Sequence, residues 1–540
     1  MPIRVQNTIQ PVVQDRDRYR RNQEWGWCSR RSSRAVHKSS GKRSRWEFSL
    51  SLLIACIVVV LTTGCRTYQD QARQITSLWV AGRATEAATA FAKAANSERG
   101  KKDGVLWDLE AGTSLRAAAK YPDSNRHFEA AAVAVDQYEQ QAEIRLASEA
   151  AAAMSNQQNL PYRGQACDKI MLHTYRALNY LALGEAEKAR PELIRAYQRQ
   201  QDAVNENRRR IEKTMAQQSS SAAQPATQSR TQGPAASSSP STDVREAEKQ
   251  RRTQESVAKA QQDPGFNAAL APITQNLEGF RFYADYVNPF TVYLDGLFFL
   301  HRGSGGSDLE RANKSLRRVA EVVAANKFVM ADLRAAEDAL RGQRPAGLTY
   351  VIFETGRAPS REQIRIDVPI ILANVSYVGA AFPKLVFHPD YVPNLHVRAG
   401  AQEETTALVA DMDAIVALDF KNEWPGILTR TLVSTTAKAV ATYFINEAGN
   451  RVDPTVGLLL QIGTAIGGLA MNIADTRSWT TLPKQFQVAR VTTPPDRKLT
   501  LIAPGFPSTE VVLEAGQVNV VYVRSITTSS PLLVTQFRLR

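Results

Sequence analysis

The stretch LALGEAEKARPELIRA, residues 181–196, decides how the N-terminal half of this 540-residue chain is interpreted. Its small and bulky apolar residues recur at helical spacing, and a glycine stands where a turn would fall. The same spacing recurs elsewhere in the chain. The recurring sets are Gly184, Ala189, Leu193 and Ala196; Gly82, Ala87, Phe91 and Ala94; Ser124, Phe128 and Ala131; and Ala312, Leu316 and Val319, preceded by Gly296. Small residues let paired helices approach closely and bulky ones fill the groove beside the next pair, so the pattern predicts helical hairpins.

This spacing resembles that of tetratricopeptide repeats, although it departs from their period of about 34 residues and no copy shows the complete pattern. An ordinary amphipathic, alanine-rich helix pair is the alternative. The resemblance implies that the hairpins bind peptides or partner helices on a concave face.

The stretch Ala216–Thr242 has no Leu, Ile, Val or aromatic residue and predicts a disordered linker. Strand-like composition begins at LTYVIFETG, and apolar residues alternate over short segments after Phe486, which predicts a small antiparallel sandwich. The predicted fold class is therefore multidomain α+β, with TPR-like helical repeats, a mixed middle and a C-terminal β-sandwich. The predicted parts are a basic leader and lipoprotein signal peptide at 1–64, TPR-like helices at 65–215, the linker at 216–242, further helices at 243–345, a mixed β/α region at 346–483 and a β-sandwich-like region at 484–540.

An export signal is predicted near the N-terminus. Arg43 and Arg45 precede the apolar run Phe48–Leu61, and small residues then lead to Gly64-Cys65. The end of this signal resembles a bacterial lipobox, which implies cleavage between Gly64 and Cys65 and acylation of Cys65. Thr62 departs from the usual Leu or Val of that position.

An uncleaved anchor is the alternative, since Trp46–Thr62 approaches the shortest length that spans a bilayer. In either case, the basic residues before the apolar run should keep the leader cytoplasmic and place the rest beyond the inner membrane. Arg66 after the cysteine, by resemblance to enteric lipoproteins, favours the outer membrane.

The net charge of +14 does not predict nucleic-acid binding, because residues 1–50 alone contribute +8. The rest of the chain is only mildly basic and shows no recognition motif. After cleavage, Cys65 would carry lipid and Cys167 would stand alone, so no internal disulfide is expected. Cys167 is interpreted as a packed helix residue.

Four blocks together resemble a large family of uncharacterised bacterial tetratricopeptide-type lipoproteins. They are YRGQACDKIMLHTYRALNYLALGEAEKARPELIRA, YVIFETGRAPSREQIRIDVPI, DMDAIVALDFKNEWPGILTRTL and ADTRSWTTLPKQFQVARV. The resemblance covers most of the chain from Tyr162 onward and implies an envelope lipoprotein. It carries no catalytic residues to transfer.

Candidate chemistry is sparse. Glu354 ends an apolar strand, with Arg357 and Arg361 nearby; it could bind a cation or act as a base, and a turn-stabilising salt bridge is the favoured alternative. Trp479 could be an exposed anchor or could plug a domain boundary. Glu354, Arg357 and Trp479 are thus the candidate partner-binding residues.

No metal site, cofactor or catalytic residue is predicted. Asp411, Asp413 and Asp419 could supply oxygen ligands to Ca²⁺, but the run lacks a glycine-centred loop. The six histidines lack zinc-ligand spacing, and hydrolase and nucleotide-binding motifs are missing.

The uncharged segment Val456–Ile473 contains Gly463 and Gly467 at GxxxG spacing, so it could insert in a membrane, but a buried helix is favoured. The favoured function is a non-enzymatic, membrane-anchored scaffold that binds a periplasmic or outer-membrane protein, with no nucleic acid. The rivals are an envelope hydrolase joining Glu354 to Asp411 or Asp413, and a pore or export subunit using the uncharged segment.

Overall fold

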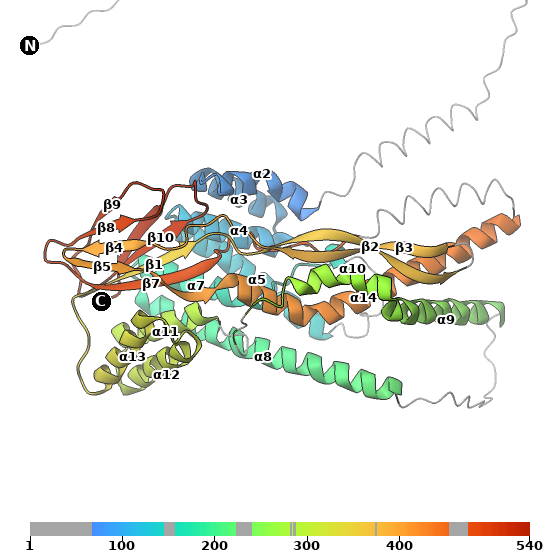
Figure 1. The fold of residues 1–540 in the computed structure, drawn as a ribbon, viewed down its shortest axis with the longest axis horizontal. Helices are drawn as coiled ribbons and strands as arrows, with labels where there is room; N and C mark the ends of the chain where they lie inside the picture. The colour runs from blue at the N-terminus through green and yellow to red at the C-terminus, as the bar shows by residue number, and fades with distance from the viewer. Residues whose placement is uncertain are drawn as a thin grey trace, which may run out of the picture. The chain divides into compact units, whose positions relative to one another are not determined.

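The computed structural model describes residues 67–144, 157–222, 240–280, 283, 288–372, 375–452 and 473–540. The chain divides into two compact units, Met1–Cys65 and Arg66–Arg540. Cys65 and Gly64, with the whole export signal, lie outside the described residues, as does the uncharged segment up to Asn472. The described part is mixed α+β, with twelve α-helices and three sheets (Figure 1).

The N-terminal half is helical, as predicted. Its helices are α2 (Tyr68–Val80), α3 (Ala84–Glu98), α4 (Gly104–Ala117), α5 (Tyr121–Ile144), α7 (Ala166–Ala182) and α8 (Ala186–Ala222), with a short 3₁₀ turn at Gln157–Asn159. Gly82 and Gly184 adopt φ of +74° and +76° in the turns after α2 and α7. That left-handed conformation suits glycine at a helix C-terminus. The turns of two predicted hairpins are therefore where the sequence indicated.

Three more helices continue this half of the chain: α11 (Pro289–Arg302), α12 (Gly306–Val322) and α13 (Lys327–Leu340). Asn288 caps α11, because its side-chain oxygen accepts hydrogen bonds from the backbone N–H of Phe290 and Thr291. Leu316 of α12 packs directly on Gly296 of α11. The helices pair as hairpins, but the structure does not confirm that they are tetratricopeptide repeats.

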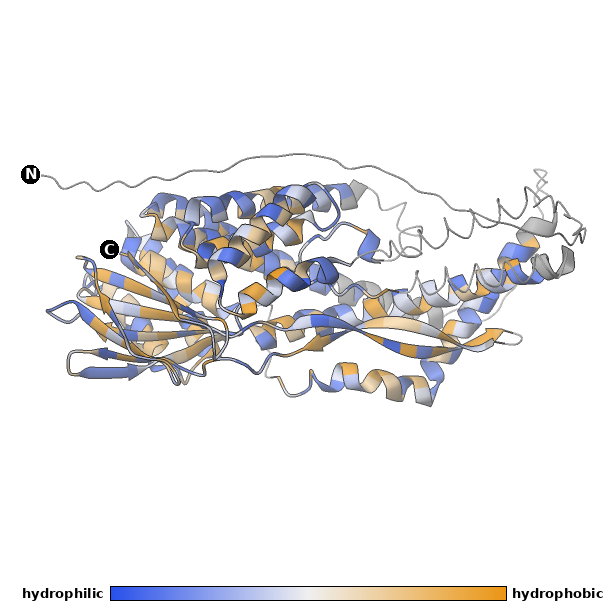
Figure 2. Ribbon diagram, turned by 90° about the horizontal axis from the view of Figure 1, so that it is seen from above, coloured by the Kyte–Doolittle hydropathy of each residue, from blue (hydrophilic) through white to orange (hydrophobic). Residues whose placement is uncertain are grey.

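The strands form sheets that combine distant parts of the sequence. The five-stranded sheet has the order β11 (Leu533–Arg538), β10 (Val518–Ser525), β1 (Leu348–Thr355), β7 (Gln485–Thr492) and β6 (Ala407–Asp411). The four-stranded sheet has the order β5 (Gln402–Thr405), β4 (His396–Ala399), β8 (Lys498–Ile502) and β9 (Thr509–Val512). Both belong to one hydrophobic core with the helical hairpins. In Figure 2 hydrophobic residues run along these strands, whereas the helices alternate hydrophobic and hydrophilic.

The predicted C-terminal sandwich is not confirmed as a separate unit. Strands β7, β10 and β11 pair with β1 and β6, while β8 and β9 join β4 and β5. The pairing of β10 with β1 is parallel, with Leu348 opposite Val518, so it is not an all-antiparallel arrangement either. The sandwich is not confirmed because strand pairing joins segments that are far apart in the sequence, such as β1 and β10.

A second core lies in what we call the arm. The arm consists of α9 (Pro240–Gln262), α10 (Pro264–Gln275), the two-stranded sheet β2 (Ser360–Leu372) and β3 (Val375–Val386), and α14 (Met412–Val452). Ile366, Val368 and Phe382 form the buried face of the hairpin against these helices. Helices α8 and α9 extend into both ends of the predicted linker, and residues 223–239 lie outside the described part.

The close packing of helix hairpins can be tested at Gly112 of α4. A Cβ atom there would lie 2.5 Å from the ring of Phe128 of α5, which is fully buried. We expect Gly112→Ala to lower the free energy of unfolding by about 1–3 kcal/mol, because the ring has no room to move. Chemical denaturation measures the change. Gly306→Ala in α12 is the matched control, since nothing lies within 4 Å of its Cβ position; an equal loss in both variants would contradict the packing argument.

Candidate functional site

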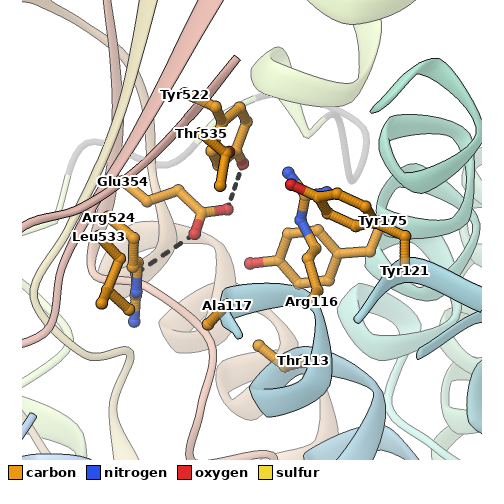
Figure 3. Close-up of a pocket in the computed structure, with 10 residues that line it drawn as sticks. All are labelled: Thr113, Arg116, Ala117, Tyr121, Tyr175, Glu354, Tyr522, Arg524, Leu533 and Thr535. Carbon is orange, nitrogen blue, oxygen red and sulfur yellow. Dashed lines mark hydrogen bonds and ion pairs between the residues drawn. The ribbon is translucent and has the colours of Figure 1, made fainter. Parts of the chain in front are cut away.

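Glu354 lies at the end of β1, on the side of the five-stranded sheet that faces the helices. Its neighbours are on β10, where the Tyr522 hydroxyl donates a hydrogen bond of 2.5 Å to Glu354 Oε1 and Arg524 Nη1 lies 3.7 Å from Oε2 (Figure 3). Burial and the negative charge of Glu354 raise the pKa of Tyr522 well above its usual value. Tyr522 is therefore a neutral donor that holds the carboxylate in place.

The helices complete this arrangement from the opposite side. The Arg116 guanidinium of α4 lies 4.4 Å from the ring centroid of Tyr522 and 5.4 Å from that of Tyr175 on α7. Arg116 Nη1 also donates a hydrogen bond of 3.0 Å to Asn179 Oδ1. Cation–aromatic contacts of this kind strengthen when water is excluded. The cluster thus joins α4 and α7 to the sheet.

The space between these side chains is a cavity of about 20 Å³, enough for one water molecule. Two guanidinium groups and one carboxylate border it, together with aromatic rings and aliphatic side chains. The lining residues are Thr113, Arg116, Ala117, Tyr121, Tyr175, Glu354, Tyr522, Arg524, Leu533 and Thr535. The geometry suits a buried ion-pair cluster that fixes the helices on the sheet. It is too small for a glycan or peptide.

The salt bridge expected at Glu354 is present, but its cationic partner differs from the two nearby arginines. Arg361 pairs instead with Glu423 of α14 at 2.9 Å, and Arg357 Nη2 lies 3.4 Å from His388 Nδ1. Burial, with the charges of Arg357 and Lys484, lowers the pKa of His388 to about 4. Arg357 is therefore half-buried beside a neutral histidine and apart from the Glu354 cavity.

Trp479 is 2% exposed, so it is not an exposed anchor. Its indole Nε1 donates 3.0 Å hydrogen bonds to the hydroxyls of Thr113 and Thr481, and its ring lies 6.0 Å from those of Phe128 and Tyr175. It fills the junction between the helical hairpins and the chain that leads into β7. The structure thus brings Trp479 close to the Glu354 cluster through Tyr175 and Thr113.

Two residues that sequence reasoning missed anchor the same loop. Glu110 of α4 is fully buried and accepts hydrogen bonds from the backbone N–H groups of Thr480 and Thr481, at 2.7 and 3.0 Å, and from the Thr480 hydroxyl. Arg477 pairs with Asp103 at 3.0 Å. The block ADTRSWTTLPKQFQVARV, which contains this loop, was singled out by its resemblance to a family. Its sequence does not show that the loop contacts Glu110 and Asp103.

The acids of the rival hydrolase do not share a cleft with Glu354. Asp411 is in register with Gln485, which pairs with Thr355, so its side chain lies on the other face of the sheet. Asp413 pairs with Lys484, and burial raises its pKa to about 6. The described ranges contain no cluster of three side chains able to hold a metal ion.

Asp419 of α14 connects the arm to the helical hairpins. Its Oδ2 accepts a 2.9 Å hydrogen bond from the backbone N–H of Cys167, in the first turn of α7. Burial raises the pKa of Asp419 to about 7, and the negative charges of Glu423 and Asp168 add to the effect. Cys167 is a free, buried cysteine, and burial raises the pKa of its thiol as well.

These observations predict a pH-dependent stability. A carboxyl group with a raised pKa stabilises the fold while it is protonated, and this contribution is lost as the pH rises from about 4 towards 7. We expect Asp419→Asn to remove that loss, because an amide oxygen can still accept the Cys167 N–H. Urea unfolding at several pH values should therefore favour the variant by a few kcal/mol more at pH 8 than at pH 4. The exposed Asp367→Asn is the control; a pH-independent difference at Asp419 would refute the prediction.

Two of the helices, α4 and α11, are buried along almost their whole length. Every residue of α11 from Pro289 to His301 is buried, as is every residue of α4 from Gly104 to Arg116. The contacts at Glu354, Trp479 and Glu110 show that this chain's own sheet and loops cover much of α4. Helices α4 and α11 therefore offer almost no accessible side chains to a partner, and partner binding on a concave helical face stays a prediction.

A larger hollow among the described residues is a groove of about 520 Å³ between α9 and the end of the β2–β3 hairpin. Basic side chains of α9 form one wall and apolar side chains of β2 form the other. The lining residues are Arg251, Arg252, Glu255, Lys259, Ile370, Ile371, Leu372 and Ser376. Its size suits a few residues of a peptide. None of the residues proposed from the sequence lies there.

Comparisons with protein-family models, curated proteins and solved structures found no match to this chain. No helix in the described ranges is both long and apolar enough to cross a membrane.

Proposed function

We propose that this chain is an exported lipoprotein, acylated on Cys65, that acts as a non-enzymatic protein-binding scaffold in the cell envelope. The resemblance of four sequence blocks to tetratricopeptide-type lipoproteins supports the class. The hairpin spacing of Gly184, Ala189 and Leu193 supports a helical-repeat origin for α7 and α8. Arg66 favours the outer membrane as the place of anchoring, with the body in the periplasm.

The groove between α9 and β2 is the observation that carries the proposal. It is open, has room for a partner's side chains, and combines basic residues such as Lys259 with apolar residues such as Ile371. The Glu354 cavity, by contrast, has room for about one water molecule. The scaffold therefore binds its partner at the arm, and the polar cluster at Glu354 serves the fold.

Lipidation is tested by mass spectrometry of the mature N-terminus from isolated membranes. An acylated peptide beginning at Cys65 is expected in the wild type and not in Cys65→Ser. An unprocessed N-terminus in the wild type would replace the lipoprotein with a helical inner-membrane anchor.

Partner binding is tested by placing a photo-crosslinking residue at Ser376, on the rim of the groove, in intact cells. We expect one protein adduct, lost when Lys259→Glu reverses a charge of the groove wall. The matched control position is Val512 on β9, which is 59% exposed and outside the arm. Equal crosslinking at Ser376 and Val512, or adducts unaffected by Lys259→Glu, would remove the groove as the binding site.

A further inference from the structure

The cavity beside Glu354 is lined by hydrogen-bond donors that the rest of the protein does not use. Arg524 Nε and Nη1 and the Tyr175 hydroxyl are buried, and no residue in the described ranges is their hydrogen-bond partner. The ion pair between Arg524 Nη1 and Glu354 Oε2 is 3.7 Å long, which is too long for a hydrogen bond. Arg524 and Tyr175 are 4% and 0% exposed, so bulk water does not reach these donors. Buried donors normally have a partner, so these three indicate a bound ligand.

The donors face the cavity from both sides. In Figure 3, Glu354 and Arg524 reach into it from the sheet, and Arg116 and Tyr175 reach into it from the helices. Burial, with the negative charge of Glu354, raises the pKa of Tyr175 well above its usual value. The Tyr175 hydroxyl therefore keeps its proton and can donate it in a hydrogen bond. A single small ligand can accept from the sheet and from the helices at once.

The charges around the cavity do not balance. Glu354 forms its ion pair with Arg524, so it compensates one of the two guanidinium groups. Arg116 forms no ion pair with a carboxylate in the part of the chain that the structure describes, and it donates to the neutral Asn179. Arg116 lies in the last turn of α4, whose dipole offsets only part of a positive charge. A buried charge without a partner is strongly destabilising, so an anion would stabilise the fold here.

The size of the cavity limits the anion to a single atom. A water molecule needs roughly 10–15 Å³ of such space, so a cavity of about 20 Å³ also admits an ion slightly larger than water. Sulfate, phosphate and carboxylic acids have several heavy atoms and are too large. A halide ion accepts hydrogen bonds without donating any, which fits three unpartnered atoms that are all donors.

We propose that the cavity binds one chloride ion, which joins the helical hairpins to the five-stranded sheet. The ion accepts hydrogen bonds from Arg524 and Tyr175 and neutralises the charge of Arg116. Glu354 keeps its hydrogen bond from Tyr522, so two negative charges then balance two guanidinium groups. The site is a structural part of the fold, and it goes beyond the scaffold function proposed above without depending on it.

The test measures the thermal unfolding of the full chain, purified in detergent, in sodium chloride and in sodium gluconate of equal ionic strength. Gluconate is too large for the cavity. A ligand that binds only the folded state raises the unfolding temperature with its concentration. We expect a rise of about 1–2 °C for each tenfold increase in chloride above its dissociation constant, and no such rise with gluconate.

Tyr175→Phe locates the effect at the cavity, because it removes one donor and keeps the ring. In gluconate the unfolding temperature should stay the same or rise slightly, since a buried hydroxyl without a partner is lost. In chloride it should fall, and the chloride dependence should weaken. Tyr293→Phe is the matched control, since the buried Tyr293 hydroxyl donates a 2.7 Å hydrogen bond to Asp332. It should lower the unfolding temperature by the same amount in both salts.

Bromide replaces chloride and can be located directly. Anomalous diffraction from crystals soaked in sodium bromide should show a peak between Arg524 and Tyr175. The absence of that peak would overturn the proposal, as would a chloride dependence that Tyr175→Phe leaves unchanged. Equal unfolding temperatures in the two salts would also overturn it and would assign the cavity to a water molecule. None of these outcomes bears on the acylation of Cys65 or on the groove, because neither enters the measurement.

Discussion

Replacing Glu110 with alanine is expected to lower the free energy of unfolding by about 3–5 kcal/mol. The carboxylate is fully buried in α4 and accepts hydrogen bonds from two backbone N–H groups and one hydroxyl of Thr480 and Thr481. Alanine would leave these donors buried without acceptors, and each lost partner costs the desolvation of the donor. Urea denaturation measures the change.

Two variants separate this effect from a general loss of charge. Glu110→Gln keeps one acceptor oxygen and should lose less than alanine does. Glu86→Ala removes an exposed carboxylate of α3 that pairs with Arg83, and its stability should match that of the wild type. If Glu110→Ala unfolded at the same urea concentration as Glu86→Ala, the loop of Thr480 would not depend on α4.

Trp479→Ala should lower the free energy of unfolding by about 3–5 kcal/mol, because a buried indole leaves a cavity that its neighbours cannot fill. The ring packs between Phe128 and Tyr175, and its N–H is satisfied by Thr113 and Thr481. Thermal unfolding followed by circular dichroism measures the loss. Trp479→Phe should lose less, since it keeps most of the apolar contact.

The same variant checks that the buried Trp479 acts through stability and does not contact a partner directly. If Trp479 is a buried plug, Trp479→Ala lowers the stability of the protein, and any loss of partner binding follows from unfolding. If Trp479 contacted a partner directly, Trp479→Ala would weaken partner binding while the stability of the protein stayed the same. Tyr377→Ala, at an aromatic side chain that is 60% exposed, is the control and should leave the unfolding temperature unchanged.

The helices were predictable because their signals are local. Apolar spacing indicates a helix within one segment, and Gly82 or Gly184 marks the turn after it. The sequence also indicated one contact between paired helices. Gly296 and Leu316 were both singled out from their spacing, and they lie against each other. Strand β1 was visible for the same reason, as the strand-like composition of LTYVIFETG, which ends at a glycine.

The arrangement of strands was not predictable, because pairing is a long-range property. Nothing in QVNVVYVRS shows that β10 lies parallel to β1 rather than beside β9, its neighbour in the sequence. The electrostatic partner of Glu354 was hidden in the same way. Arg357 and Arg361 are close in the sequence, whereas Arg524 becomes a neighbour only when β10 pairs with β1.

The site was the least predictable part. Glu354 and Trp479 were singled out by their residue types, and both turned out to hold the helices on the sheet. The groove residues Arg251 and Lys259 looked like ordinary charges on a solvated helix. They form a groove only because the β2–β3 hairpin brings Ile371 beside them, and no local pattern reports that contact.

Helix α2, the first described helix, contacts loops next to the C-terminal strands, and this has a consequence for the order of folding. The Thr527 hydroxyl donates a hydrogen bond to the carbonyl of Val80, 447 positions earlier, and the Gln69 side chain donates to the carbonyl of Thr476, 407 positions later. Contacts of such separation form late and slow the folding of a chain. A ribosome-bound or partly translocated chain that lacks residues after Gln517 has neither β10 nor β11 and cannot complete the five-stranded sheet. The five-stranded sheet therefore cannot form until the segment with β10 and β11 is available, and the proposed export would require such an incompletely folded chain.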